Sequence, residues 1–257
     1  MAVQMSRPWI RSGRLEAGRS RILRYMASRL LKKALPARPV PTRVLRGPFR
    51  GAVMVVDRRH SIRKILGLYE HELNTWLVNA IPRVTRVLDV GANDGYFTFG
   101  CAAAFRRHGR NGQIIAFEPQ ADHVHSLRES IAIQPAHTTQ ISVRRCLVGS
   151  RITPGMTTLD SVSWQSGDCN ARGNTLIKID VEGAELEVLS GALSWLSSSN
   201  LFVIEVHEMT SLQRIAQLFS AHSLALDRID QRPLPFLGRE QRQQENWWLV
   251  SALNQRS

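Results

Sequence analysis

A strand, a tight glycine-containing loop and a helix are predicted in succession over Val87–Thr98, which reads VLDVGANDGYFT. This stretch constrains the fold more than any other. Its apolar start ends in Asp89, the loop spans Gly91–Gly95, and an apolar, helix-like segment follows. A strand, a glycine loop and a helix N-terminus together bring backbone N–H groups against a nucleotide-like ligand. The alternative is a turn that serves only the fold.

The spacing of this loop separates two kinds of nucleotide site. A dinucleotide fingerprint requires glycines at positions 91, 93 and 96, and position 96 is Tyr, so the spacing excludes an NAD-type loop. The pattern Asp89-x-Gly91-x-Asn93-x-Gly95 is one residue shorter. It resembles the first motif of class I S-adenosylmethionine (SAM) methyltransferases, with Asn in place of the middle glycine. Asn tolerates a left-handed backbone better than most residues, so we expect the loop to keep its geometry.

Strands and helices alternate along the rest of the chain. The pattern predicts strands over 51–57, 86–90, 114–117, 141–148, 175–180, 201–207, 224–229 and 247–253. It predicts helices over 61–80, 96–107, 121–133, 184–196 and 212–221, and a turn-rich segment over 150–174. Alternating strands and helices indicate an α/β fold, doubly wound around a mostly parallel, seven-stranded type of sheet with helices on both faces.

The positive charge of the chain is concentrated at its beginning. Residues 1–50 hold 13 of the 34 Lys and Arg residues but only one acid, Glu16, so they carry +12 of the net charge of +13. Apolar residues recur at helical spacing over 22–35, and three prolines over 36–41 then predict a stiff linker. We therefore divide the chain into a basic, partly helical arm (1–44) and a nearly neutral domain (45–257). The arm is suited to an anionic membrane surface, to nucleic acid or to targeting, or it packs on its own domain.

Cysteines and apolar runs bear on location. The three cysteines form no CxxC and no metal-ligand spacing, which is typical of reduced thiols in a cytosolic protein. No run approaches the roughly 18 apolar residues that a membrane span needs. We expect a cytoplasmic protein without a transmembrane segment, peripheral to a membrane if the arm docks there.

Acidic residues follow the predicted strands. In doubly wound sheets, ligands bind at the carboxyl ends of the strands, where the strand order reverses. The acidic residues at these ends are suited to a ligand with ribose hydroxyls and cationic centres. They are Asp89, Glu118, Asp180, Glu182, Glu205 and Glu208, and His207 directly precedes Glu208. Glu118 lies 23 residues after Gly95, where an acidic ribose ligand is expected. The alternative is a surface carboxylate.

Lys178 is unusual because it lies inside TLIKID, which otherwise reads as a buried strand. An unpaired ammonium there costs several kcal/mol. With this strand between the first and fifth, Asp89 and Glu205 are its candidate partners. The residue is either a structural ion pair or a group of the active site.

Five motifs occur in the order seen in the FkbM-type methyltransferases, which the chain resembles over residues 45–253. They are DVGANDGYFT (89–98), AFEP (116–119), TTLDS (157–161), LIKIDVEGAELEVLSGA (176–192) and VIEVHE (203–208), and Leu66–Glu70 resembles a short motif before the domain. The resemblance implies a SAM-dependent enzyme, most often an O-methyltransferase acting on a hydroxyl of a natural product, sugar or lipid. One departure is that the segment between the third strand and Thr157 is shorter than in relatives.

These arguments give one set of residues for each role. For the cofactor we predict Asp89, Gly91, Asn93, Asp94, Gly95, Glu118 and Leu147. Removing the proton of an alcohol requires a base, and the catalytic candidates are Asp180, Glu182, His207 and Lys178, with Glu208 as a further carboxylate. No spacing demands a metal, so none is predicted, and a divalent metal held by Asp180 and its neighbours is the alternative, since carboxylates converge there.

Two other functions compete with this one. A nucleic-acid methyltransferase would use the arm on phosphates. Against it, the folded part is nearly neutral, and the Asn/Asp-Pro-Pro-aromatic motif of many base N-methyltransferases is absent. The other alternative is a non-catalytic protein with the same fold that binds a partner through the arm.

Overall fold

The computed structural model describes residues 38–135, 139–164, 174–234 and 246–253. The amphipathic helix predicted over 22–35 lies outside these ranges. Among the described helices, none combines the length and the apolar character needed to cross a bilayer.

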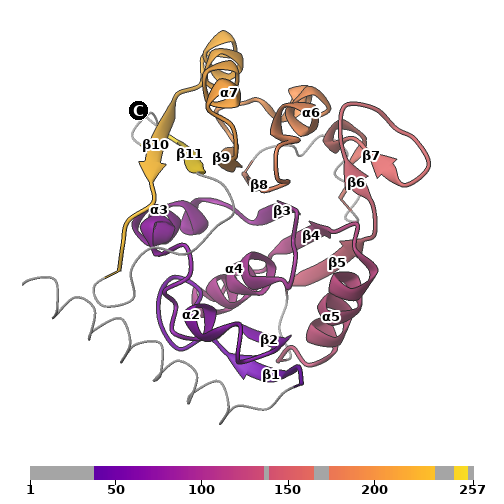
Figure 1. The fold of residues 1–257 in the computed structure, drawn as a ribbon, viewed down its shortest axis with the longest axis vertical. Helices are drawn as coiled ribbons and strands as arrows, with labels where there is room; N and C mark the ends of the chain where they lie inside the picture. Colours follow the sequence, from indigo (N-terminus) through magenta and orange to yellow (C-terminus); the bar gives the residue numbers. More distant parts are fainter. Residues whose placement is uncertain (1–37, 136–138, 165–173, 235–245, 254–257) are drawn as a thin grey trace, which may run out of the picture.

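A seven-stranded sheet forms the centre of the fold, in the order β10-β11-β9-β8-β3-β4-β5 (Figure 1). Its strands are β3 (Arg86–Val90), β4 (Gln113–Phe117), β5 (Gln140–Arg144), β8 (Thr175–Ile179), β9 (Leu201–Val206), β10 (Leu226–Asp230) and β11 (Trp247–Ser251). All pairings between β5 and β9 are parallel, and β11 is antiparallel to both of its neighbours. This order confirms the predicted class I, doubly wound architecture.

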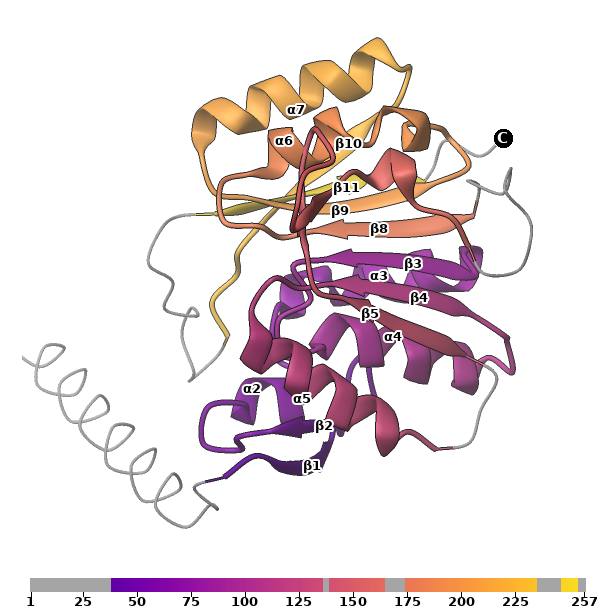
Figure 2. The same cartoon turned by 90° about the vertical axis from the view of Figure 1, so that its right-hand side faces the viewer.

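Helices cover both faces of the sheet, as predicted. On one side lie α3 (Asn74–Ala80), α4 (Tyr96–Arg107) and α5 (Ala121–Ala132), and on the other α6 (Glu185–Ser190) and α7 (Met209–Ala221) (Figures 1 and 2). Neighbouring strand residues enter different cores, since Val87 belongs to the cluster under α4 and Leu88 to the cluster under α6 and α7. Side chains alternate along a strand, so the apolar runs of the sequence are buried on both faces.

A second, small sheet lies under α5 and α4. It pairs β1 (Val40–Arg43) with β2 (Val53–Val56) in antiparallel register. β2 confirms the strand predicted over 51–57. β1 falls in residues interpreted as arm and linker. Pro41 is compatible with it because β1 has β2 as its only neighbour in this sheet, and an edge strand tolerates a missing N–H.

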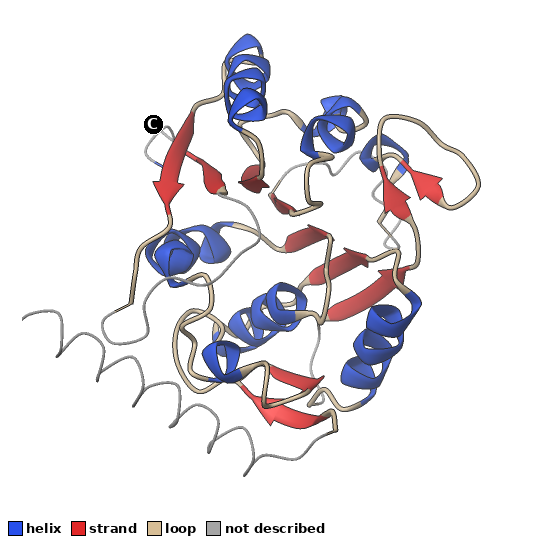
Figure 3. Cartoon of the chain, viewed as in Figure 1, coloured by secondary structure: helices blue, strands red, loops and turns tan. Residues whose placement is uncertain are grey.

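The single helix predicted over 61–80 is wrong (Figure 3). The segment forms α2 (Ile62–Ile65), the 3₁₀ turn η1 (His71–Leu73), α3, and then η2 (Ile81–Arg83). Gly67 interrupts the helix with φ +68°, and a Cβ at this position would lie 2.2 Å from the carbonyl oxygen of Arg46. The break is therefore caused by contact with a distant chain segment, which helical periodicity does not reveal.

Two further predicted elements are also divided. The strand predicted over 141–148 becomes β5 and β6 (Leu147–Val148), and β6 pairs in parallel with β7 (Met156–Thr157). The short segment before Thr157 therefore keeps a small strand pair. The helix predicted over 184–196 ends with α6 and resumes as η4 (Leu193–Trp195). At Gly191 between them, a Cβ would lie 2.1 Å from the carbonyl oxygen of Gly149.

Candidate active site

The site lies where four parallel strands end. The chain leaves β3 toward β4 and β5 on one side, and β8, β9 and the closing strands lie on the other, so the strand order reverses between β3 and β8. The residues that follow β3, β4, β8 and β9 meet at this edge of the sheet. This is the place at which doubly wound sheets bind their ligands.

The glycine loop is held by the neighbouring strands. The N–H groups of Gly91 and Ala92 donate to the carbonyl oxygen of Phe117, at 3.0 and 3.1 Å. Gly91 has φ +78°, and an added Cβ would lie 1.8 Å from the carbonyl oxygen of Asp180. Asn93 adopts φ +50° and Gly95 adopts φ +86° at the start of α4. The prediction that Asn93 takes the left-handed conformation is confirmed.

Glu118 fastens this loop to the end of β4. Its Oε2 accepts a hydrogen bond from the Asn93 N–H at 2.8 Å, and its Oε1 accepts one from the Gln120 N–H at 2.9 Å. His123 Nδ1 lies 3.6 Å from Oε1. The residue is only 4% exposed, which excludes the alternative of a surface carboxylate. Each carboxylate oxygen keeps a lone pair for a further donor.

Lys178 lies directly beside the glycine loop. Its Nζ donates to the carbonyl oxygen of Gly91 at 2.8 Å and forms ion pairs with Asp180 Oδ2 at 3.1 Å and Asp89 Oδ1 at 3.5 Å. The predicted pairing with Asp89 is therefore confirmed. Asp180 is the second ion-pair partner, while Glu205 accepts a hydrogen bond from Asn246.

The charges around Lys178 determine its protonation. Burial by itself lowers the pKa of Lys178, but the carboxylates of Asp180 and Asp89 outweigh burial and raise it. Burial raises the pKa of Asp89, against the opposing effect of Lys178 and a 2.5 Å hydrogen bond from Thr98. Lys178 is consequently a charged ammonium that links β8, β3 and the glycine loop.

Glu185 and His207 form a pair that the sequence did not predict. Glu185 is fully buried at the start of α6, and its Oε1 lies 2.6 Å from His207 Nδ1. The Gly183 N–H also donates to Oε1, at 2.9 Å. Burial lowers the pKa of His207, but the hydrogen bond and charge of Glu185 outweigh it, so the pKa is raised. A sequence signal existed, since Glu185 stands three and four residues before the buried Val188 and Leu189.

Asp180, Glu205 and His207 come together at the ends of β8 and β9. Each offers one ligand atom, and these atoms lie within 4.8 Å of one another. Glu205 accepts from Asn246 Nδ2, and Gln231 Nε2 in turn donates to Asn246 Oδ1 at 2.6 Å. Asn246 precedes the antiparallel β11, which returns it to this edge. Within the described part of the chain, these three ligands are suited to a divalent cation or to the hydroxyls of a polyol.

Three predicted residues are exposed to solvent, and a fourth is engaged by a cation. Glu182 and Glu208 are exposed in the loops after β8 and β9, and Leu147 is 50% exposed in β6. Asp94 pairs with Lys64 Nζ at 2.5 Å and accepts from the Tyr96 N–H at 3.3 Å. Asp94 therefore fixes the loop to α2 and the first turn of α4.

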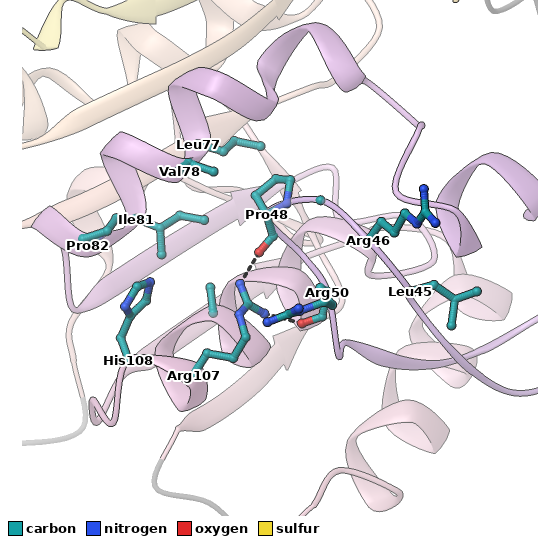
Figure 4. Close-up of a pocket in the computed structure, with 12 residues that line it drawn as sticks. Leu45, Arg46, Pro48, Arg50, Leu77, Val78, Ile81, Pro82, Arg107 and His108 are labelled. Carbon is teal, nitrogen blue, oxygen red and sulfur yellow. Dashed lines mark hydrogen bonds between the residues drawn. The ribbon is translucent and has the colours of Figure 1, made fainter.

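A cavity of about 520 Å³ lies elsewhere, at the opposite end of α4 from the glycine loop (Figure 4). Figure 4 shows Arg107 reaching from α4 to the backbone of Pro48 and Arg50, to which it donates hydrogen bonds. Apolar residues of α3 and η2 form the opposite wall, among them Val78 and Ile81. This cavity shares no residue with the group at the strand ends.

Comparison with known proteins agrees with this geometry. Residues 147–223 match the model of a family described as the methyltransferase FkbM domain. The hexuronic acid methyltransferase AglP of Haloferax volcanii is 26% identical over 200 residues, which is 69% of this chain and 78% of that protein.

Solved structures give weaker likenesses. A methyltransferase FkbM from Methylobacillus flagellatus aligns at 16% identity with a TM-score of 0.47, over 90% of this chain and 60% of that one. This chain therefore spans less than two thirds of that relative. A putative RNA methyltransferase from Pyrococcus horikoshii aligns at 13% identity with a TM-score of 0.43, over 72% of this chain and 82% of that one.

Proposed function

We propose that this chain, which matches the methyltransferase FkbM domain over residues 147–223, transfers the methyl group of SAM to a hydroxyl oxygen, in particular a sugar hydroxyl. The proposal assigns this activity to residues 45–257. The observation that carries it is the position of the glycine loop and Glu118 beside the group formed by Asp180, Glu205 and His207. A nucleoside site and a proton-accepting site thus share one edge of the sheet.

The residues at the first of these sites fit SAM. Glu118 is buried and anchored by two backbone N–H groups, and its remaining lone pairs suit the two hydroxyls of a ribose. The carboxylates of Asp89 and Asp180 outnumber Lys178, which favours a ligand with cationic centres. Asp89 Oδ1 is buried and has no hydrogen bond within the described residues. SAM, when bound, supplies an electrophilic methyl group on a sulfonium.

The acceptor is proposed from the second site. Carboxylates and an imidazole accept hydrogen bonds from alcohols, and they orient the oxygen and receive its proton. A sugar is favoured because the named relative AglP is a hexuronic acid methyltransferase. Most of the rate enhancement then comes from holding the acceptor oxygen in line with the methyl carbon.

Calorimetry with SAM and S-adenosylhomocysteine tests the cofactor. Incubation with methyl-labelled SAM and separate pools of sugars, glycolipids and RNA tests the acceptor. We expect binding of SAM and label in the sugar or glycolipid pool. Asp180→Asn should bind SAM but transfer methyl more slowly, while Asp227→Asn, at an exposed position of β10, should match the wild type. Folded protein that does not bind SAM contradicts the proposal, and label confined to RNA overturns the acceptor.

We also propose that the basic arm, residues 1–44, holds the protein on the cytoplasmic face of an anionic membrane. The support is compositional, since residues 1–50 carry +12 of the net charge. Sedimentation with vesicles containing phosphatidylserine, at low and high salt, tests this. Binding should require the anionic lipid and weaken with salt. Equal binding to neutral vesicles would contradict it.

A further inference from the structure

We infer that His207 is the base that takes the proton of the acceptor hydroxyl, and that Glu185 is the positioning residue that makes it one. This inference rests on the proposed function and assigns its proton transfer to one atom. Its observation is the 2.6 Å contact between His207 Nδ1 and Oε1 of Glu185, a carboxylate with no exposed surface. Glu185 begins α6 and His207 directly follows β9, so the two residues are 22 positions apart in the sequence.

The contact fixes the tautomer of the imidazole. A buried carboxylate is an acceptor only, so the proton of the short hydrogen bond belongs to Nδ1. Oε1 is held in place by the Gly183 N–H at 2.9 Å. The neutral imidazole then carries its lone pair on Nε2, for which no hydrogen bond is present within the described residues. His207 is 14% exposed by its side chain, so a ligand at the strand ends can reach it.

The burial of Glu185 argues against a merely incidental contact. Its Oε2 has no hydrogen-bond partner among the described residues, although the residue is fully buried. Burying a carboxylate with half of its acceptors unsatisfied is unfavourable for folding. Buried charges of this kind cluster at functional sites, where they change the pKa of a neighbouring group. Here the neighbouring group is a histidine at the edge of the sheet where the ligand is proposed to bind.

Several charges face His207. Asp180 comes from the end of β8, Glu182 from the loop after it, Glu185 from α6, and Glu205 from β9 itself. Lys178 is the nearby cation, and it pairs with Asp180. The balance around the ring is negative, so it stabilises an imidazolium.

Asp180 stands first among the sequence candidates for the base, and the geometry favours His207 instead. Oδ2 of Asp180 is engaged by Lys178 Nζ at 3.1 Å, and that lysine also binds the Gly91 carbonyl. Asp180 thus has a fixed orientation beside the glycine loop. Its role in this arrangement is to orient the acceptor and to stabilise the imidazolium that forms.

The step balances as follows. The acceptor oxygen forms a bond to the methyl carbon while the O–H proton passes to Nε2 of His207. The electron pair of the breaking carbon–sulfur bond stays on the sulfur, which leaves as a neutral thioether. The products are a methyl ether and an imidazolium, held by Glu185 on its Nδ1 side. The imidazolium then releases its proton to solvent.

The pH dependence of single-turnover methyl transfer tests this inference. His207 must be neutral to act, so the rate should rise with pH through its raised pKa and then level off. His207→Gln should lower the plateau on the order of 10²–10⁴-fold, the usual contribution of a general base. Glu185→Gln should lower the plateau less and should move the rising limb to lower pH, because the charge that raises the pKa is gone.

Two matched variants separate positioning from structure. Glu185→Asp keeps the negative charge, so the rising part of its pH–rate profile should lie closer to that of the wild type than the profile of Glu185→Gln does. Glu187→Gln, on the exposed side of the same helix, should leave both the plateau and the limb unchanged. An unmoved limb in folded Glu185→Gln overturns the inference. Activity that requires added Mg²⁺ and is lost with EDTA also overturns it, because His207 would then be a metal ligand.

A second measurement does not depend on turnover. Nitrogen NMR of the wild-type protein reports the tautomer and the pKa of His207, even if Glu185→Gln does not fold. We expect a proton on Nδ1 and a raised pKa, and a proton on Nε2 in the neutral ring overturns the dyad. A protein that binds SAM but methylates no acceptor instead counts against the proposed function, while the NMR result still decides the tautomer.

Discussion

The two ends of α4 use charge in opposite ways. At its N-terminal end, buried Asp89 and half-buried Asp180 form ion pairs with buried Lys178 beside a loop of left-handed residues. At its C-terminal end, arginines bind backbone carbonyls. Arg106 donates to Gly51, and Arg107 donates to Pro48 and Arg50.

This difference separates the end of α4 that carries the proposed cofactor site, called the functional end below, from a structural end. Cations are favourable at a helix C-terminus, and here they also close the turn between β1 and β2 onto the helix. Their partners are backbone carbonyls. Each of these hydrogen bonds only takes the place of a hydrogen bond to water, so its net contribution to folding stability is modest. The charges at the N-terminal end compensate one another, and removing Lys178 leaves the buried Asp89 carboxylate without an opposite charge. Substitutions at the two ends should therefore differ in size and in kind.

Gly91→Ala should have the largest effect. The residue has φ +78°, and the new Cβ would meet the Asp180 carbonyl oxygen at 1.8 Å, so the loop and the end of β8 must separate. We expect loss of SAM binding by calorimetry and a large drop in melting temperature. Gly109→Ala is the matched control, because Gly109 has φ +62° with no atom within 4 Å of the new Cβ. It should cost only about 1–2 kcal/mol, the penalty of the left-handed backbone. Equal effects at both positions would show that the contact with Asp180 is unimportant.

Lys178→Met should cost roughly 3–5 kcal/mol of unfolding free energy, because it leaves Asp89 and Asp180 without their cation. The loss should depend on pH. Burial already raises the pKa of Asp89, and the charge of Lys178 opposes this rise. The pKa of Asp89 should therefore rise further when Lys178 is replaced. A raised folded-state pKa gives stability that is present at low pH and lost as pH increases. The variant should therefore be closer to the wild type near pH 5 than near pH 8.

Denaturant unfolding at both pH values measures this effect. Lys64→Met is the comparison, since its partner Asp94 is 22% exposed and can be solvated when the pair is lost, whereas Asp89, a partner of Lys178, has no exposed surface. It should cost only about 1 kcal/mol. A Lys178→Met protein that is as stable as the wild type but transfers no methyl would reassign Lys178 from structure to catalysis.

Much of the functional end could be predicted from the sequence because its signals are local. The strand, the glycine spacing and Asn93 lie within a few residues of one another, and their conformations follow from backbone sterics. The position of Glu118 follows from the length of one helix and one strand. The partner of Lys178 followed from strand order, since Asp89 and Lys178 are register partners in adjacent strands.

The parts that were missed depend on contacts between distant segments. Glu185 meets His207 only because α6 packs beside β9, and Asn246 reaches Glu205 only because β11 runs antiparallel. The break at Gly67 depends on the carbonyl of Arg46. Periodicity describes one element at a time, so it predicted a continuous helix there and did not single out Glu185.

Arg107→Met tests the structural end and should have a smaller effect. Methionine keeps the apolar stem but removes the hydrogen bonds to Pro48 and Arg50. Burial and the neighbouring Arg50 and Arg106 lower the pKa of Arg107, so its charge is itself slightly unfavourable there. We expect a loss of about 1 kcal/mol, or about 2–4 °C in melting temperature. SAM affinity should not change, and a weakened affinity would show that the two ends of α4 are coupled.

Deleting residues 1–37 should have the smallest effect on the folded part. The deletion stops before β1 begins at Val40, so the pairing of β1 with β2 and the packing of β2 against α4 are kept. Most of the net charge is removed, since residues 1–37 hold nine basic residues and one acid and so carry +8 of the net charge of +13. Screened charges that are not part of a core contribute little to stability. We therefore expect an unchanged melting temperature and SAM affinity, together with weaker binding to anionic vesicles. A truncated protein that melts much lower would show that the apolar positions over 22–35 belong to the core, and the arm would then be part of the domain.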